Sequence, residues 1–238
     1  MSITALNFLQ IDMASTPVDT AGAAETTEKT LSVISLITSG GIGGIVIMGM
    51  LFVLSIIAVY IFVERFGAIK RANKQDPNFM NNLKDHIANG KMESAKALCE
   101  STDTPVARLL EKGVVRIGKS MGDISASIEN QGKIEVQKLE SGLPYLATIA
   151  GGAPMIGFLG TVIGMVLAFK EMANAGGQID VSLLAEGIYT AMTTTVGGLF
   201  VGILAYFGYN YLTTRVESVI YKMEVSATEF LDLLHEPV

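Results

Sequence analysis

The segment Leu143–Phe169 contains 27 consecutive residues and no charged side chain. As a helix with a rise of about 1.5 Å per residue, it would extend roughly 40 Å, whereas the hydrocarbon core of a bilayer is about 30 Å thick. An uncharged segment of this length is typical of a helix that crosses a membrane, where backbone groups must pair internally. We therefore predict a transmembrane helix over residues 143–169.

The small residues of this segment share one face of the predicted helix, because they recur at spacings of three and four. Gly160 and Gly164 form the GxxxG pattern through which membrane helices pack closely. The members of this face are Ala153, Gly157, Gly160, Thr161, Gly164 and Ala168. We predict that this face packs against another protein helix, with Thr161 supplying its one hydroxyl.

A second uncharged face of this kind lies in the apolar run over residues 183–212, where Gly198 and Gly202 repeat the GxxxG pattern. Its members are Gly187, Ala191, Thr194 or Thr195, Gly198, Gly202 and Ala205. Beyond residue 212, apolar residues continue at spacings of three and four with charged residues between them. We therefore predict a transmembrane helix over 183–212 that continues as an amphipathic stem over 213–238.

The remaining segments complete an all-α integral membrane protein with three transmembrane helices. Residues 40–63 are continuously apolar and predict the first transmembrane helix, with lipid around much of it. Residues 64–142 predict a helical soluble region, in which Asp76-Pro77 and Thr104-Pro105 are typical helix starts and Asp123 begins the last helix. Residues 1–39 predict a polar tail with a short interfacial helix, and 170–182 a loop.

The basic residues predict the orientation in the membrane. Of the 17 Lys and Arg residues, 13 fall within residues 64–142, and two more lie in the C-terminal stem. Cytoplasmic segments carry such an excess. We therefore expect residues 64–142 and the C-terminus in the cytoplasm, and both the N-terminus and the 170–182 loop outside it.

Several functional classes lack support in the sequence. No catalytic triad, zinc-protease motif, P-loop or dinucleotide-binding motif is present. A single cysteine, Cys99, and two distant histidines offer no metal site, so we predict no enzyme and no cofactor. A pI of about 5.0 without a basic block does not favour nucleic-acid binding. The acidic residues of 64–142 alternate with basic ones, as on solvated helix faces.

Candidate ion-pathway residues are Thr161, Thr190, Thr194, Thr195 and Glu186. Membrane threonines commonly hydrogen-bond their own helix or let helices approach. Here, however, one hydroxyl on the first small face and a cluster on the second predict an uncharged polar seam. Glu186 is the carboxylate nearest a transmembrane helix, and it fits either a favourable first-turn position or an ion-pathway role.

Together, LESGLPYLATIAGGAPMIGFLGTVIGM and LLAEGIYTAMTTTVGGLFVGILAYFGYN resemble the MotA/TolQ/ExbB proton channel family, in particular its ExbB-like members. The resemblance covers about residues 40–234. It implies a pentamer in the bacterial inner membrane, enclosing helices of ExbD-like partners whose Asp carries the ion. Such a ring would power TonB-dependent outer-membrane transport, or serve a TolQ-like or other stator role in envelope integrity or motility.

By this resemblance, Thr161 and Thr195 match the family's threonines in the second and third transmembrane helices. Thr190 stands where many ExbB proteins have Glu. Three interpretations remain open: Glu186 substitutes for that Glu, the partner's Asp suffices, or the translocated cation is Na⁺ instead of H⁺.

Two other classes also remain open. One is a transporter whose seam binds a small solute, although three transmembrane helices without an inverted repeat do not favour it. The other is a passive membrane scaffold in which Gly157, Gly160, Gly164, Gly198 and Gly202 only pack helices together.

Overall fold

The computed structural model describes residues 41–74, 76–174 and 181–235, apart from the side chains of residues 41, 42, 181–183 and 186. The chain divides into two units, Met1–Ser32 and Val33–Val238, and all described residues belong to the second. The predicted N-terminal tail and interfacial helix, and residues 175–180 of the predicted 170–182 loop, lie outside the described residues. The predicted loop is too long, because residues 170–174 belong to α7 and residues 181–182 to α8. Every element in the described ranges is a helix, in agreement with the predicted all-α class.

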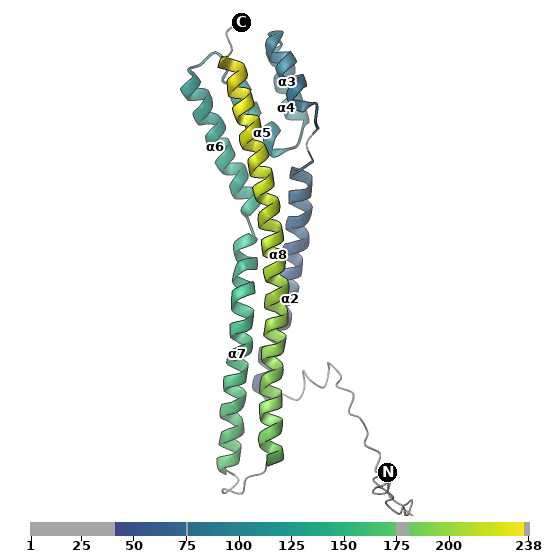
Figure 1. Ribbon diagram of the computed structural model, residues 1–238, viewed down its shortest axis with the longest axis vertical. Helices are drawn as coiled ribbons and strands as arrows, with labels where there is room; N and C mark the ends of the chain where they lie inside the picture. Colours follow the sequence, from purple (N-terminus) through teal and green to yellow (C-terminus); the bar gives the residue numbers. More distant parts are fainter. Residues whose placement is uncertain (1–40, 75, 175–180, 236–238) are drawn as a thin grey trace, which may run out of the picture. The chain divides into compact units, whose positions relative to one another are not determined.

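Three helices, α2 (Gly41–Ala72), α7 (Leu143–Asn174) and α8 (Val181–His235), are long and apolar enough to cross a membrane. Helix α7 packs antiparallel along the N-terminal part of α8, and α2 lies beside both (Figure 1). Each helix continues beyond its uncharged segment, since α2 runs through Arg71 and α8 forms one helix to His235. Three helices of this length and composition make the chain a multi-pass membrane protein.

Four shorter helices separate α2 from α7: α3 (Phe79–Ala88), α4 (Met92–Ser101), α5 (Pro105–Val114) and α6 (Met121–Glu140). The predicted start at Thr104-Pro105 is confirmed, because the Thr104 hydroxyl accepts a hydrogen bond from Ala107 N at 3.3 Å. The start predicted at Asp76-Pro77 is two residues early: the Asp76 carboxylate accepts a hydrogen bond from Asn78 N in a local turn, and the helix begins at Phe79. Helix α6 begins at Met121, two residues before the predicted start, with Ser120 as its N-cap.

The C-terminal part of α8 forms the core of the soluble region. Leu212, Val216, Val219, Met223 and Phe230 are buried at spacings of three, four and seven residues, so one stripe of α8 faces the other helices. Phe230 lies against Gly113 of α5, where an added Cβ would come within 2.6 Å of its ring. The stem predicted from the apolar periodicity therefore docks on α5 and α6.

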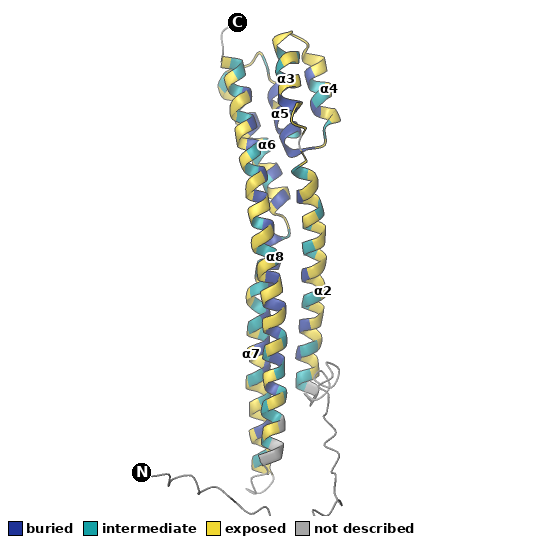
Figure 2. Cartoon of the chain, turned by 45° about the vertical axis from the view of Figure 1, so that its right-hand side comes forward, coloured by how far each residue is buried: buried dark blue, intermediate teal, exposed yellow. Residues whose placement is uncertain are grey.

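The outer surface of α2 is apolar and exposed. Among its exposed side chains, Phe52 and Tyr60 are each 67% accessible, and most of the helix is coloured as exposed or intermediate in Figure 2. In a soluble protein such a surface would be costly. In a membrane protein it is the surface that lipid or a neighbouring chain covers.

The expectation that the charges of the soluble region lie on solvated helix faces is also wrong. The charges of α6 do not all lie on a solvated face, because the side chain of Glu135 is only 1% exposed. It accepts hydrogen bonds from Arg108 of α5 at 2.8 and 3.1 Å, from Lys138 at 2.9 Å and from Gln131 at 3.0 Å. Burial raises the pKa of Glu135, but the hydrogen bonds from Arg108 and Lys138 outweigh it and hold the pKa below 4.5.

Replacing Glu135 with Gln should destabilise the soluble region, since it leaves Arg108 without its buried counter-charge. A hydrogen bond to a charged group contributes about 1.5–3 kcal/mol, and the cost should lie in this range because Arg108 is 35% exposed and keeps its ion pair with Asp103. A lowered folded pKa stabilises the protein fully above the unfolded pKa and progressively less below it. The gap in urea midpoint between wild type and Glu135→Gln should therefore be largest at pH 7 and shrink below pH 4.5.

The matched control is Glu129→Gln on the same helix, because Glu129 is exposed and pairs only with Lys133 one turn away. This change should leave the midpoint nearly unchanged. Equal midpoints for both variants at pH 7, measured in detergent, would show that the buried pair contributes nothing.

Candidate functional site

The seam between α7 and α8 is built from glycines. Gly157, Gly160 and Gly164 of α7 face Gly198, Ala191 and Thr194 of α8, and Gly202 faces Pro154. A Cβ added to Gly198 would lie 2.5 Å from Ala153 O and 2.9 Å from Gly157 Cα. A Cβ on Gly157 would lie 2.7 Å from Thr194 O. The two backbones therefore approach each other directly, as membrane helices do where small residues line the contact.

Three hydroxyls meet at this seam around one carbonyl, that of Gly157. The hydroxyls of Thr194 and Thr195 each donate to Gly157 O across the seam at 3.1 Å. Thr161 reaches the same oxygen only weakly, at 3.4 Å, and its hydroxyl makes a hydrogen bond with that of Thr195. The first small face thus supplies one hydroxyl and the second supplies two to a single polar cluster.

The three threonines of this cluster differ in exposure. Thr194 is 2% exposed and also bonds to Ala191 O at 2.7 Å, so both of its interactions are internal to the seam. Thr161 and Thr195 are only partly buried. Thr194 is therefore suited to holding the helices together, whereas the Thr161–Thr195 pair lies within reach of a neighbouring helix.

This partly buried pair lies on the side of the seam away from α2. On α7, Ile163 contacts the start of α2 near Gly43, and on α8, Gly197 lies against Met48 of α2. Thr161 and Thr195 each precede one of these contact residues by two positions, which corresponds to roughly 200° around a helix. Their hydroxyls therefore face the opposite side of the α7–α8 pair.

Thr190 lies elsewhere. Its methyl carbon is 3.9 Å from the position of a Cβ built on Gly44, so it faces α2 along with Gly197, seven residues further on. The structure consequently brings together Thr161, Thr194 and Thr195 of the candidate set and separates Thr190 from them. Glu186 is in the second turn of α8, but its side chain lies outside the described residues.

The membrane part of this seam has no charged side chain of its own. Neither residues 143–169 nor residues 187–214 contain Asp, Glu, Lys, Arg or His. Hydroxyl and carbonyl oxygens can solvate a cation or a protonated carboxyl, but they do not hold a proton near neutral pH. An ion that moved by binding to a carboxylate at this depth would require that carboxylate from another chain.

Two features of the seam are not evident from residue spacing. The first is Gly157 O, the shared acceptor, because a spacing pattern identifies small faces but not individual carbonyls. The second is Pro154 inside α7, which removes an N–H from the helix ladder and whose ring lies against Gly202. A proline in the middle of an apolar run followed by GxxxG is the signal that points to such a contact.

Comparison with known proteins shows sequence similarity to one family. The sequence pattern of the MotA/TolQ/ExbB proton channel family matches residues 101–225, which is more than half of the chain and includes α7 and the seam part of α8. A putative biopolymer transport protein ExbB homolog of Methanothermobacter thermautotrophicus is 27% identical over 199 residues, covering 82% of this chain and 67% of that protein.

Two further relatives illustrate the range of the similarity. Biopolymer transport protein exbB1 of Vibrio cholerae is 29% identical over 189 residues, or 73% of this chain and 78% of the relative. The Tol-Pal system protein TolQ of Pseudomonas aeruginosa is 38% identical over 104 residues, or 44% of this chain and 45% of the relative. The chain thus spans less than half the length of that TolQ protein. On these matches, the chain belongs to the MotA/TolQ/ExbB proton channel family and is an ExbB-like member of it.

Proposed function

We propose that the protein is an ExbB-like energiser subunit driven by an ion-motive force, and that it powers TonB-dependent outer-membrane transport. The observation that carries this proposal is the Thr161–Thr195 pair, a polar site on an otherwise apolar surface that faces away from α2. Moving one charge across 100 mV releases about 2.3 kcal/mol, so several ions per step suffice for mechanical work.

The proposed assembly is a homopentameric ring in the bacterial inner membrane. In it, α7 and α8 face the interior and α2 faces lipid, which is consistent with the exposed apolar surface of α2. The interior holds the membrane helix of an ExbD-like partner whose Asp supplies the carboxylate that the seam lacks. A TonB-like protein receives the motion, and H⁺ or Na⁺ is the translocated cation.

The proposed orientation places α3 to α6 and the C-terminus in the cytoplasm. Its support is the excess of Lys and Arg between the first two transmembrane helices. The protein suits cysteine labelling because Cys99 is 1% exposed. Burial, with the nearby charges of Glu111 and Glu100, raises the pKa of this thiol to about 12.

In intact cells, a membrane-impermeant maleimide should therefore label a cysteine introduced at Ser2 and not one introduced at Lys91 or Lys119. The wild-type protein, which contains only Cys99, should remain unlabelled until it is unfolded. Labelling of Lys91→Cys and protection of Ser2→Cys would overturn the proposed orientation.

Cation flux into proteoliposomes tests the function itself. Vesicles containing the protein and a one-span partner with a membrane Asp should show flux driven by an imposed potential. Vesicles containing the protein alone, or the partner with Asp→Asn, should not. Separate H⁺ and Na⁺ gradients identify the cation. Full flux without a partner would refute the shared-carboxylate mechanism, and no flux in any combination would favour a passive scaffold.

A TolQ-like role is the second candidate. Its support is the 38% identity to TolQ over 104 residues. Loss of the protein should reduce TonB-dependent uptake if the role is ExbB-like. It should instead cause detergent sensitivity with normal uptake if the role is TolQ-like.

A further inference from the structure

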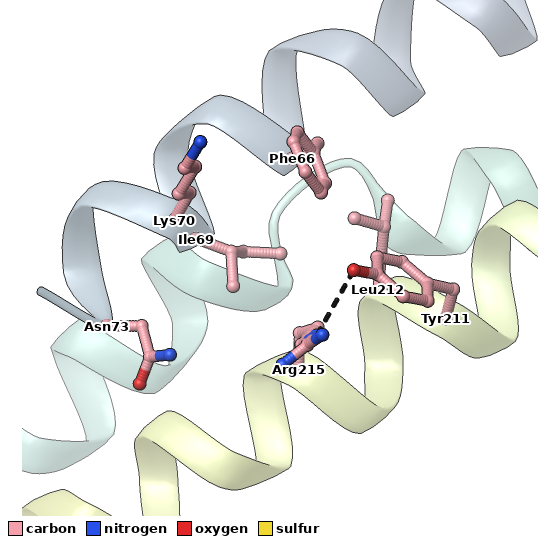
Figure 3. Close-up of a pocket in the computed structure, with 7 residues that line it drawn as sticks. All are labelled: Phe66, Ile69, Lys70, Asn73, Tyr211, Leu212 and Arg215. Carbon is pink, nitrogen blue, oxygen red and sulfur yellow. Dashed lines mark hydrogen bonds between the residues drawn. The ribbon is translucent and has the colours of Figure 1, made fainter.

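A crevice between α2 and α8 combines two chemically different parts. The first part is a groove of about 370 Å³, lined mainly by apolar side chains that include Ala58, Phe62, Val201 and Ala205. The second is a pocket of about 200 Å³ whose lining includes Phe66, Lys70, Asn73 and Arg215 (Figure 3). Tyr211 lines both parts, and Phe62 stacks on Phe66 at 6.1 Å, so the groove leads into the pocket.

The two parts lie at different depths relative to the membrane. The groove residues of α2 and α8 belong to the uncharged runs 42–63 and 187–214. The pocket begins just beyond them: Phe66 follows Glu64 and Arg65, and Arg215 is the first charged residue of α8 after Glu186. The pocket is therefore at the membrane surface, on the side of α3 to α6.

The pocket is cationic and its charges are available. Arg215 donates its Nε to the Tyr211 hydroxyl at 3.3 Å, and its guanidinium lies 5.2 Å from the centre of the Tyr211 ring. These contacts orient the side chain and leave its terminal N–H groups without a partner in the described part of the chain. Neither Arg215 nor Lys70 forms an ion pair among the described residues.

A third cation stands at the same end of the pocket. Lys222, two turns beyond Arg215 on α8, donates to Asn73 Oδ1 of α2 at 2.6 Å. This bond ties α8 to α2 through Asn73, which lines the pocket, and places a positive charge beside it. Arg215 of α8 and Lys70 of α2 both line the pocket, and the Lys70 ammonium points outward, away from Arg215 (Figure 3). A guanidinium in the pocket with an ammonium at its rim suits a phosphate group.

We propose that this crevice binds one anionic phospholipid of the adjoining leaflet. An acyl chain occupies the groove, and the phosphate lies at Arg215 with Lys70 at the rim. The combination favours a lipid over a free phosphate. A lipid fills both the apolar groove within the membrane and the cationic pocket at the membrane surface, whereas a free phosphate uses only the pocket. The bound lipid joins α2 to α8 at the point where both helices leave the membrane.

Native mass spectrometry of the detergent-solubilised protein tests this proposal with three probes. We expect dioleoyl phosphatidylglycerol to remain bound to each chain, and dioleoyl phosphatidylcholine and inorganic phosphate to bind much more weakly. The double variant Lys70→Gln/Arg215→Gln should bind phosphatidylglycerol roughly 10- to 30-fold more weakly, since each basic residue near a membrane surface contributes a severalfold factor.

The control is Lys91→Gln/Lys119→Gln, which removes two cations from the soluble region away from the crevice and should retain wild-type affinity. Circular dichroism of both double variants confirms that they are folded. Equal affinity for phosphatidylcholine, equal affinity for inorganic phosphate, or unchanged phosphatidylglycerol binding by folded Lys70→Gln/Arg215→Gln would each overturn the proposal. The readout is binding, so it does not depend on whether the protein conducts ions.

Discussion

Replacing Gly157 with leucine should force α7 and α8 apart and abolish assembly. A Cβ at this position would lie 2.7 Å from Thr194 O and 3.1 Å from the Cα atoms of Gly198 and Thr195. All three are backbone atoms, which cannot rotate away as a side chain can, so relief requires separating the helices. Overpacking by a few methylene groups already costs about 1–3 kcal/mol, and here it falls on the contact that holds the helix pair together.

The matched control is Gly151→Leu, on the same helix and less than two turns away. Gly151 is exposed, and a Cβ there meets nothing within 4 Å. Because leucine favours helices over glycine by roughly 1 kcal/mol, this control should be as stable as wild type or more so. Native mass spectrometry and thermal aggregation in detergent separate the two outcomes. A stable, normally assembled Gly157→Leu protein would mean that the seam is not what holds the subunit together.

The membrane part of the fold could be predicted from the sequence because few alternatives satisfy a lipid environment. An uncharged run such as Leu143–Phe169 must be a helix, and its small residues must meet another such face. The two periodic patterns predict that the small faces of α7 and α8 pack on other helices, but only the structure shows that Gly157 lies against Gly198. Each pattern lies within a single helix, so the spacing of its residues is enough to predict which of them share a face.

The soluble region was less predictable because its contacts join distant residues. Glu135 shares its helix with exposed charges such as Lys133, and only the position of Arg108, 27 residues earlier, explains why it is buried. Similarly, the apolar periodicity of the stem predicts a buried stripe but not that Phe230 meets Gly113. A charged residue can be assigned to a face from sequence only when the neighbouring element is known.

The threonines of the candidate site show the same limit within the membrane. Thr190 and Thr195 are close in sequence and both lie on α8, yet one faces α2 and the other faces away from it. From the sequence, both threonines lie close to the small face of α8. The spacing pattern does not tell which of them lies on the side of that face towards α2. The position of α2 separates these edges, and it is set by contacts such as Gly197 with Met48.

Thr161→Val and Thr195→Val should leave the protein assembled but reduce ion-coupled work by at least about tenfold. The reason is a difference in magnitude. A hydrogen bond between neutral groups in a membrane protein contributes about 0.6 kcal/mol on average. Losing the Thr161–Thr195 bond, and for Thr195→Val also the bond to Gly157 O, should therefore cost only about 1 kcal/mol of folding free energy. A hydrogen bond to a charged group contributes about 1.5–3 kcal/mol, and 1.4 kcal/mol in a barrier corresponds to a tenfold change in rate.

Thr193→Val and Thr194→Val are the matched controls on α8. The Thr193 hydroxyl bonds only to Tyr189 O of its own helix, at 3.0 Å, so its loss should affect neither assembly nor flux. Thr194 is buried in the seam, so the Thr194→Val substitution should reduce thermal stability more than it reduces flux. Thr190→Val separates the two edges of the seam: if the conducting surface is the one away from α2, this variant should retain more flux than Thr195→Val.

The partner-dependent flux assay in proteoliposomes decides between these roles. If Thr190 serves the ion in place of the Glu found in many relatives, Thr190→Val should lose flux, and Thr190→Glu should shift the preference from Na⁺ towards H⁺. If the Thr161–Thr195 pair solvates the partner's acidic side chain, the loss should follow those two residues instead. A Thr161→Val/Thr195→Val double variant with full flux and normal assembly would remove both hydroxyls from the mechanism and leave the seam a packing surface.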